Sequence, residues 1–343
     1  MEDYNLNIID FLEKSHTMPV IDVRSPAEFE HGHIPGAFNL PLFNNEERSI
    51  VGTLYLQEGQ SEAVTKGWEL AGPKMKHYIE KAKILASGEE TLLHCWRGGM
   101  RSNSMAWLLN TVGIKAYTLE GGYKNYRHHV RAFFSKPRNL IIIGGMTGSG
   151  KTDVLKALST QGKQVIDLEG LARHKGSVFG GIGMPDQPTT EQFENNLFVA
   201  LHHLNPEEPV FAEDESLAIG RVFIPGPFFE QMSSARFLKL VVPLDRRVQR
   251  LVETYTGGDN GSLVESVKRI ERRLGLEKAA KAIDYINKNE MKTAVEIVLQ
   301  YYDNVYIQGM NVARRKDVAE IVLNNESPGE IAQKISDLIK SNP

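Results

Sequence analysis

Short apolar runs alternate with longer stretches of helical periodicity in the first part of the chain. Residues 18–24 and 91–95 are short and apolar and predict two buried strands. Residues 101–111 carry apolar positions at helical spacing, and residues 116–119 predict a third strand. This order of elements indicates an α/β arrangement.

The alternation continues with residues 140–143, an apolar run typical of a parallel strand. A glycine-rich turn follows, and residues 151–158 predict a helix. A basic stretch of helical pattern, residues 123–138, lies between the two parts of the chain. Further strands are predicted at residues 164–167, 209–213, 237–242 and 317–323. We therefore expect two α/β domains, residues 1–136 and residues 137–343, the second being a parallel sheet with helices on both faces.

The composition is that of an ordinary globular protein. A length of 343 residues suits two domains, and the formal net charge of -3 does not by itself indicate a polyanionic partner. The N-terminus lacks the features of a signal peptide, and no apolar run is long enough for a membrane span. The single cysteine excludes an internal disulfide, and no His/Cys/Asp spacing resembles a zinc site. We expect a cytoplasmic protein that does not bind a membrane.

The only cysteine lies in the run His94-Cys95-Trp96-Arg97-Gly98-Gly99-Met100-Arg101-Ser102. This spacing is typical of a loop whose N–H groups wrap a tetrahedral oxyanion while an arginine binds two of its oxygens. The N–H groups, a helix N-terminus, Arg97 and Arg101 would stabilise a thiolate, which makes Cys95 the predicted nucleophile. The alternative is a small buried core residue, and the flanking glycines and arginines do not favour it.

A complete phosphate loop follows some fifty residues later. Residues 145–152 match G-x-x-x-x-G-K-[ST] at every position, between a predicted strand and a predicted helix. Thr152 is expected to bind Mg²⁺, with Glu213 or Asp214 as a further metal ligand or as an acid-base group. The predicted diphosphate-binding residues are Gly145, Thr147, Gly148, Ser149, Gly150, Lys151 and Thr152.

Basic residues gather on two later stretches of helical pattern. Their spacing places several of them on one helix face, where they could bind a phosphate backbone. A solvated surface is the more common role of such a face. The candidate nucleic-acid-binding residues are Arg246, Arg247, Arg250, Lys268, Arg269, Arg272 and Arg273.

The segment before the cysteine resembles the opening of rhodanese domains. The matching residues are 21–29, Ile-Asp-Val-Arg-Ser-Pro-Ala-Glu-Phe, and 32–37, Gly-His-Ile-Pro-Gly-Ala. The resemblance implies a rhodanese-like fold for the first domain and a cysteine that handles a chalcogen. The loop after Cys95 is longer than the usual rhodanese loop, which leaves room for a larger or phosphate-bearing anion.

The whole chain resembles the bacterial tRNA 2-selenouridine synthases, which join a rhodanese-like domain to a P-loop NTPase-like domain. The likeness is carried by residues 95–102 and by residues 47–55, 167–180 and 213–220. It implies a transferase that acts on the wobble 2-thiouridine of tRNA. Such an enzyme alkylates the sulfur with geranyl diphosphate and then replaces it with selenium from selenophosphate to give 2-selenouridine.

The resemblance also implies what each site binds. Geranyl diphosphate is assigned to the phosphate loop, with Mg²⁺ as its cation, and no tightly bound cofactor is implied. Cys95 either accepts selenium as a selanyl intermediate or positions the donor, and both remain open. The partners implied are a tRNA with 2-thiouridine and an enzyme that supplies selenophosphate. The predicted selenophosphate-binding residues are Trp96, Arg97, Gly98, Gly99 and Arg101.

The geranyl chain requires an apolar groove, and residues 179–184 or 223–229 are the candidates, with core packing as their alternative role. Two other functions fit the same residues. One is a cysteine phosphatase fused to a nucleotide-binding domain, which would hydrolyse phosphate esters without tRNA. The other is an ATP-dependent sulfurtransferase, which would bind and consume ATP.

Overall fold

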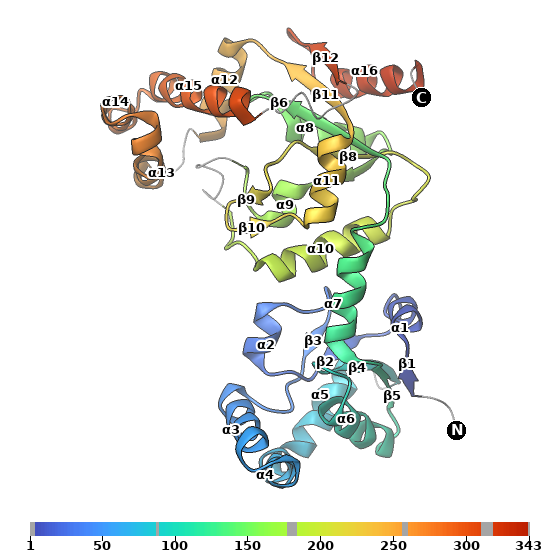
Figure 1. The fold of residues 1–343 in the computed structure, drawn as a ribbon. Helices are drawn as coiled ribbons and strands as arrows, with labels where there is room; N and C mark the ends of the chain where they lie inside the picture. Colours follow the sequence, from blue (N-terminus) through green and yellow to red (C-terminus); the bar gives the residue numbers. More distant parts are fainter. Residues whose placement is uncertain (1–3, 87–88, 177–183, 256–259, 310–317, 342–343) are drawn as a thin grey trace. The chain divides into compact units, whose positions relative to one another are not determined.

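The structure is a computed structural model that describes residues 4–86, 89–176, 184–255, 260–309 and 318–341. The chain divides into two compact units (Figure 1). The first contains residues 1–133 together with residues 194–198, and the second contains residues 134–193 and 199–343. The break after Phe133 lies close to the predicted boundary at 136, and the grouping of residues 194–198 with the first unit was not expected.

The first unit is built on a five-stranded parallel sheet in the order β1-β5-β4-β2-β3. The strands are β1 (Asn5–Leu6), β2 (Val20–Asp22), β3 (Phe38–Asn39), β4 (Glu90–His94) and β5 (Lys115–Leu119). The helices are α1 (Ile8–Lys14), α2 (Pro26–His31), α3 (Asn45–Gln57), α4 (Gln60–Ala71), the 3₁₀ helix η1 (Gly72–Lys74), α5 (Met75–Leu85), α6 (Met100–Thr111) and α7 (Gly122–Phe133).

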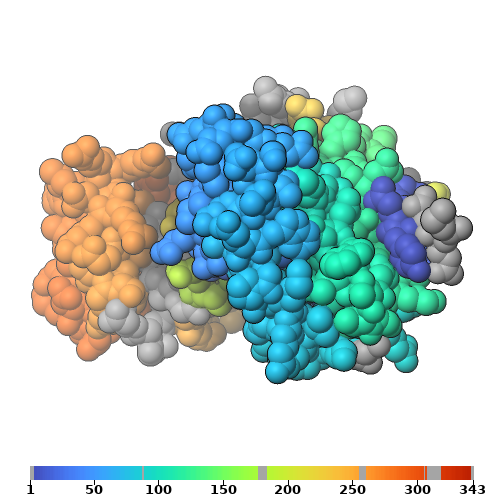
Figure 2. Space-filling model, turned by 90° about the horizontal axis from the view of Figure 1, so that it is seen from below, coloured from blue at the N-terminus to red at the C-terminus, as the bar shows by residue number. Residues whose placement is uncertain are grey.

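The core of the first unit fixes the position of the cysteine loop. Ile21 of β2, Leu93 of β4 and Met105 of α6 belong to one buried apolar cluster, which also contains Cys95. Helices α3 and α4 pack against each other and form part of the blue surface in Figure 2. Leu56 of α3 is 85% exposed. The packed cluster therefore anchors both ends of the loop that runs from β4 to α6.

The second unit has its own five-stranded parallel sheet in the order β12-β11-β6-β8-β7. Its strands are β6 (Leu140–Gly145), β7 (Gln164–Ile166), β8 (Val210–Glu213), β11 (Arg236–Val241) and β12 (Val318–Val322), and β9 (Ala218–Ile219) pairs with β10 (Val222–Phe223) in a separate hairpin. Its helices are α8 (Lys151–Thr160), α9 (Leu168–Ala172), α11 (Gly226–Ser234), α12 (Leu244–Tyr255), α13 (Asn260–Leu274), α14 (Leu276–Asn287), α15 (Met291–Gly309) and α16 (Pro328–Ser341). Helix α10 (Thr190–His202) is divided, because its residues 194–198 group with the first unit.

Both faces of this second sheet are covered. Ile141 and Ile143 pack with residues of α8 and α16 on one face. Ile142 lies between them in the strand, so its side chain points to the opposite face of the sheet. It is completely buried, and the other face is therefore covered as well. Figure 1 shows α13, α14 and α15 as a group beside α12, and these three helices share an apolar cluster of their own.

The predicted strands are confirmed to within a few residues, and so is the α/β class of both units. The predicted helix 123–138 was wrong at its end, because α7 stops at Phe133. Pro137 explains this, since a proline ring clashes with the carbonyl four residues earlier, here that of Phe133. The hairpin of β9 and β10 was not predicted. Within the described residues, no helix combines the length and apolarity that a membrane span requires.

Candidate functional site

The Cys95 side chain lies at the end of β4, where the loop to α6 begins. Its Sγ accepts hydrogen bonds from the Gly99 N–H at 3.4 Å and from the Ser102 hydroxyl at 3.3 Å. The residue is only 3% exposed. The loop therefore encloses the sulfur and directs donors at it, as expected for a site that stabilises a thiolate.

The loop is held from outside by the turn that starts α7. The N–H groups of Tyr123 and Lys124 donate to the carbonyls of Cys95 and Trp96, at 2.8 and 2.9 Å. Gly98 has a φ of +63°, and a Cβ there would lie 2.5 Å from the Leu119 carbonyl oxygen. Glycine is therefore required at position 98 both by backbone conformation and by the close approach of two chain segments.

Burial raises the pKa of the Cys95 thiol, but several partners outweigh this effect. The Ser102 hydroxyl, the Arg101 charge and the N–H groups of Ser102 and Gly99 together hold the pKa below its ordinary value of 9.0. Each of these groups favours the charged form. At a given pH near neutrality, a larger fraction of this sulfur is therefore in the thiolate form than in an ordinary cysteine.

Replacing Ser102 by alanine is expected to raise the pKa of Cys95, because the hydroxyl donor to Sγ is lost while burial remains. Cys95 is the only cysteine, so its alkylation by iodoacetamide can be followed as a function of pH. The midpoint should move to higher pH in Ser102→Ala and stay in place in Ser104→Ala on the same helix. Coincident profiles for all three proteins would show that the hydroxyl does not stabilise the thiolate.

The two predicted arginines occupy different environments. The Arg101 guanidinium pairs with both carboxylate oxygens of Glu28, at 2.7 and 3.3 Å, while Arg97 is exposed. Burial raises the pKa of Glu28, but Arg101, the Ser25 N–H and Arg48 together lower it by more. The net pKa is below its ordinary value, and the carboxyl is ionised. An anion that binds Arg101 must therefore compete with Glu28 for the guanidinium.

Glu28 was missed as a site residue. In the sequence, Glu28 lies in the run 21–29 that resembles rhodanese domains, and it forms a capping pair with Ser25 at the start of α2. The capping pair predicts a helix N-terminus and no role at the thiol. Trp96 is 37% exposed at the loop surface. The structure thus brings together Cys95, Arg101, Glu28 and the loop glycines.

His94 is the last residue of β4, directly before Cys95, and is fully buried. Its Nε2 is 3.7 Å from the Asp22 carboxylate, which forms a buried ion pair with Arg24. The Arg24 guanidinium lies 3.8 Å from the centre of the Tyr123 ring. Burial lowers the pKa of His94, so the imidazole is neutral at pH 7. This residue belongs to the buried framework that supports the loop.

The phosphate loop connects β6 to α8. Gly148 and Gly150 have φ values of +81° and +83°, which favour glycine. The Ser149 N–H donates to the Met146 carbonyl, and the Lys151 Nζ donates to the Gly145 carbonyl at 3.1 Å. The Gly145 N–H donates to the Tyr306 hydroxyl at 2.8 Å. The lysine therefore lies over the loop, where its positive charge would interact with the negative charge of a bound diphosphate.

Arg247 and Arg250 of α12 lie against the phosphate loop. Arg247 is 4% exposed, pairs with both oxygens of Asp303 and donates to the Thr147 carbonyl. Arg250 donates to the Gly148 carbonyl at 3.2 Å. The prediction of Arg247 as a residue of an exposed tRNA-binding face does not fit this placement, because its side chain is buried against the loop. Arg250 is partly exposed, and its role toward tRNA stays a prediction.

The other predicted basic residues are exposed. Arg246 donates to the Asn325 side chain, and Lys268 pairs with Glu265. The four residues of α13 lie on its solvent-facing side: Lys268, Arg269, Arg272 and Arg273. Their role toward tRNA stays a prediction.

The carboxyl group beside Thr152 is Glu169 of α9, whose oxygen accepts from the Thr152 hydroxyl at 3.2 Å. Glu213 instead accepts from the Glu169 N–H at 2.7 Å, and Asp214 lies 3.4 Å from the Tyr306 hydroxyl. In the described part of the chain, no group of three or more His, Cys, Asp or Glu residues could hold a metal ion. A Mg²⁺ ion on Thr152 stays a prediction, with Glu169 in place of the two expected acids.

Burial raises the pKa of Glu213 to about 8, and burial also raises the pKa of Glu169. The unfolded value for Glu213 is near 4.5, so the folded chain holds the proton more tightly. The free energy of unfolding should therefore fall as pH rises from about 4.5 to about 8.

Replacing Glu213 by glutamine should remove most of this loss, since glutamine has no proton to release. Between pH 5 and pH 8 we expect wild-type protein to lose on the order of 3 kcal/mol more than Glu213→Gln in urea unfolding. Exposed Glu207→Gln is the control and should follow wild type. Equal pH slopes for wild type and Glu213→Gln would contradict a buried neutral carboxyl.

The two candidate segments for the geranyl chain are not supported equally. Residues 179–183 lie outside the described residues. In the segment 223–229, Phe223 is 53% exposed and Phe228 is 1% exposed in the core. Phe228 thus has the alternative role of core packing.

Family models match both units. Residues 8–129 match the rhodanese-like domain, and residues 138–328 match the tRNA 2-selenouridine synthase AAA domain. The second match alone spans more than half of the chain. The fold predicted from the sequence is thus supported by two independent domain models.

Individual relatives carry the same name. A tRNA 2-selenouridine synthase of Nitrosomonas europaea is 41% identical over 245 residues, which is 69% of this chain and 63% of that protein. The chain thus matches less than two thirds of that relative's length. A tRNA 2-selenouridine synthase of Bdellovibrio bacteriovorus is 36% identical, and the match covers 84% of this chain and 88% of that protein's length. A solved shikimate kinase of Acinetobacter baumannii in complex with shikimate is 20% identical, with a TM-score of 0.30, over 62% of this chain and 98% of its own.

Proposed function

Because the chain belongs to the tRNA 2-selenouridine synthase family, we propose that it converts the wobble 2-thiouridine of tRNA to 2-selenouridine in two steps. The observation that carries the proposal is the presence of two complete anion-binding loops on one chain, one with a nucleophile and one without. The Cys95 loop surrounds an activated thiol. The phosphate loop offers Lys151 and N–H groups, with no nucleophile among them.

The first step is assigned to the phosphate loop. The sulfur on C2 of the uridine attacks the first carbon of geranyl diphosphate, an S–C bond forms, and the C–O bond breaks. Pyrophosphate leaves with the electron pair, and the N3 proton of the base is lost. Lys151 and the loop N–H groups stabilise the leaving group, while Arg247 and Arg250 fix the loop carbonyls on its outer side.

The second step is assigned to the Cys95 loop, whose N–H groups and Arg97 or Arg101 hold the selenophosphate oxygens. Selenium in selenophosphate already carries its full electron complement, so transfer onto a thiolate sulfur would require an oxidant. Attack by the Cys95 thiolate on phosphorus requires none. A P–S bond forms, the P–Se bond breaks, and hydroselenide leaves with the electron pair.

Hydroselenide then attacks C2 of the alkylated uridine and displaces geranylthiolate, which is a far better leaving group than sulfide. Water hydrolyses the phosphocysteine to free the thiol and phosphate. The Ser102 hydroxyl, 3.3 Å from Sγ, stabilises the thiolate that departs in this hydrolysis. Selenophosphate from a separate enzyme and the 2-thiouridine tRNA are the substrates, and the proposed setting is the cytoplasm.

The experiment is mass spectrometry of nucleosides from 2-thiouridine tRNA after incubation with the protein. Geranyl diphosphate alone should give the S-geranyl nucleoside, and both donors together should give 2-selenouridine. Unchanged 2-thiouridine in every reaction would contradict the proposal. ATP consumption or phosphate-ester hydrolysis in the same preparation would instead favour the sulfurtransferase or the phosphatase.

A further inference from the structure

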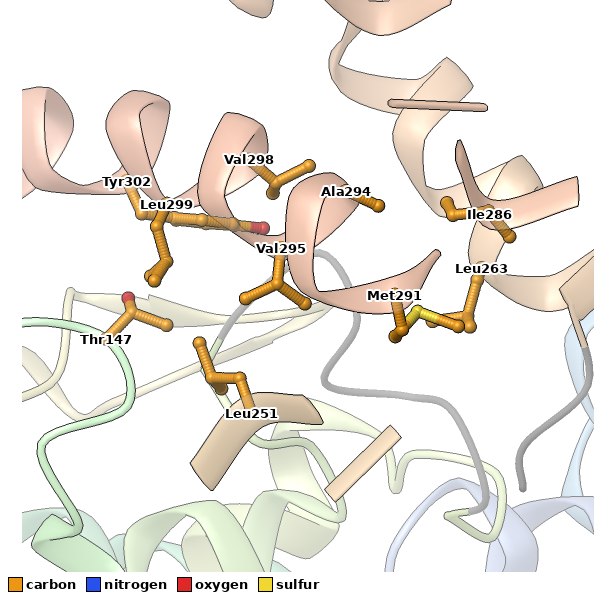
Figure 3. A pocket seen from close by; sticks show the side chains of 10 residues that line it. All are labelled: Thr147, Leu251, Leu263, Ile286, Met291, Ala294, Val295, Val298, Leu299 and Tyr302. Atoms are coloured by element: carbon orange, nitrogen blue, oxygen red, sulfur yellow. The ribbon is translucent and has the colours of Figure 1, made fainter. Parts of the chain in front are cut away.

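An apolar pocket lies directly beside the phosphate loop in the second unit (Figure 3). Ten residues line it, and all except Thr147 are hydrophobic. It encloses about 440 Å³ of space that protein atoms do not fill, part of it open to solvent. The lining of the pocket therefore suits an apolar group.

The phosphate loop forms one end of the pocket. Thr147 is a loop residue, and a Cβ on the neighbouring Gly148 would lie 3.1 Å from the Leu251 side chain, which also lines the pocket. The absence of a side chain at position 148 therefore lets Leu251 pack against the loop. A ligand with its phosphates on the loop would have its next atoms at this apolar wall.

Helix α15 lines the pocket along its length. Tyr302 and Leu299 lie toward Thr147, whereas Met291 lies at the other end together with Leu263 and Ile286 (Figure 3). Tyr302 and Met291 are eleven residues apart, which corresponds to about 16 Å along a helix. The pocket is therefore elongated and leads away from the phosphate loop.

We propose that this pocket holds the hydrocarbon chain of an organic diphosphate whose phosphate groups bind the phosphate loop. A nucleoside does not suit it, because ribose hydroxyls and base edges would be buried against a lining in which only the Thr147 and Tyr302 hydroxyls can form hydrogen bonds. The lining has no charged side chain, which suits a prenyl chain. The inference rests on the proposed function and places the geranyl chain between α12 and α15 instead of in residues 223–229.

The position of Met291 makes it a determinant of chain length. This side chain lies at the pocket end opposite Thr147 and is only partly buried (Figure 3). A longer chain would meet it first, and a shorter side chain there would give additional carbons room. Met291→Ala should therefore improve the affinity for farnesyl diphosphate relative to geranyl diphosphate.

The test is calorimetric titration of the full-length protein with geranyl diphosphate, farnesyl diphosphate and inorganic pyrophosphate. Wild type should bind geranyl diphosphate at least about 100-fold more tightly than pyrophosphate, the factor expected for burying only four of its carbons. Val295→Trp fills the pocket from α15 and should abolish most of this difference while pyrophosphate affinity stays unchanged. Lys292→Trp, exposed on the same helix, is the matched control and should behave as wild type.

Met291→Ala is the second variant, and it does not depend on accommodating a larger side chain. Its ratio of farnesyl to geranyl affinity should rise about tenfold, the factor for two further buried carbons. Equal affinities for pyrophosphate and geranyl diphosphate in wild type would overturn the inference, as would unchanged binding in both pocket variants. If the pocket variants respond as expected but no product forms on tRNA, the inference stands and the proposed reaction fails.

Discussion

Replacing Lys151 by alanine is expected to lower the rate of geranylation by at least about 100-fold, the usual effect of removing one charge-stabilising group from a transition state. Pyrophosphate develops negative charge as the C–O bond breaks. The Lys151 ammonium, 3.1 Å from the Gly145 carbonyl, is the cation that lies over the loop where this charge develops. No other side chain of the loop carries positive charge.

The measurement is the rate at which the S-geranyl nucleoside forms with 2-thiouridine tRNA in excess. Lys156→Ala is the control, because Lys156 is exposed on the same helix and lies outside the loop. It should leave the rate within about twofold of wild type. Geranylation retained in Lys151→Ala would mean that the phosphate loop binds something other than the alkyl donor.

Replacing Cys95 by serine is expected to abolish selenium incorporation while geranylation continues. Serine retains the shape of the loop, but its hydroxyl does not ionise near neutral pH and cannot attack phosphorus as the thiolate does. Selenation should fall by at least about 100-fold. The S-geranyl nucleoside should then accumulate, because the first step proceeds and the second does not.

The same pair of proteins also tests the bond that Cys95 forms. Wild type quenched in acid after brief exposure to selenophosphate should carry one phosphoryl group on Cys95, and Cys95→Ser should carry none. Detection of a selenium atom on the cysteine, and of no phosphoryl group, would contradict attack on phosphorus. It would show that the selanyl intermediate forms instead. Loss of both geranylation and selenation in a folded Cys95→Ser protein would contradict the assignment of the steps to separate sites.

Local pattern was enough to locate both loops and most strands. The cysteine loop and the phosphate loop are each continuous in sequence. The backbone geometry of both loops requires glycine at fixed positions, and these glycines are visible as a motif in the sequence. Strands such as 140–143 are buried on both faces and are therefore apolar throughout.

Residues that reach the sites from distant parts of the chain could not be predicted in this way. Glu28 meets Arg101 across 73 positions, and Arg247 meets the Thr147 carbonyl across 100. Neither contact leaves a local pattern, because each depends on how the strands are ordered in the sheet. For the same reason Arg247 was expected on an open face, although tertiary packing buries it beside Asp303.

We propose that two separate sites on one chain carry out two successive steps. In the most direct test, the Lys151→Ala variant is incubated with tRNA that already carries S-geranyl-2-thiouridine. Selenophosphate is present and geranyl diphosphate is absent. We expect 2-selenouridine at the wild-type rate, because this variant lacks only the alkylation site. No 2-selenouridine from this tRNA, under conditions where wild type forms it, would contradict the assignment of the two steps to separate sites.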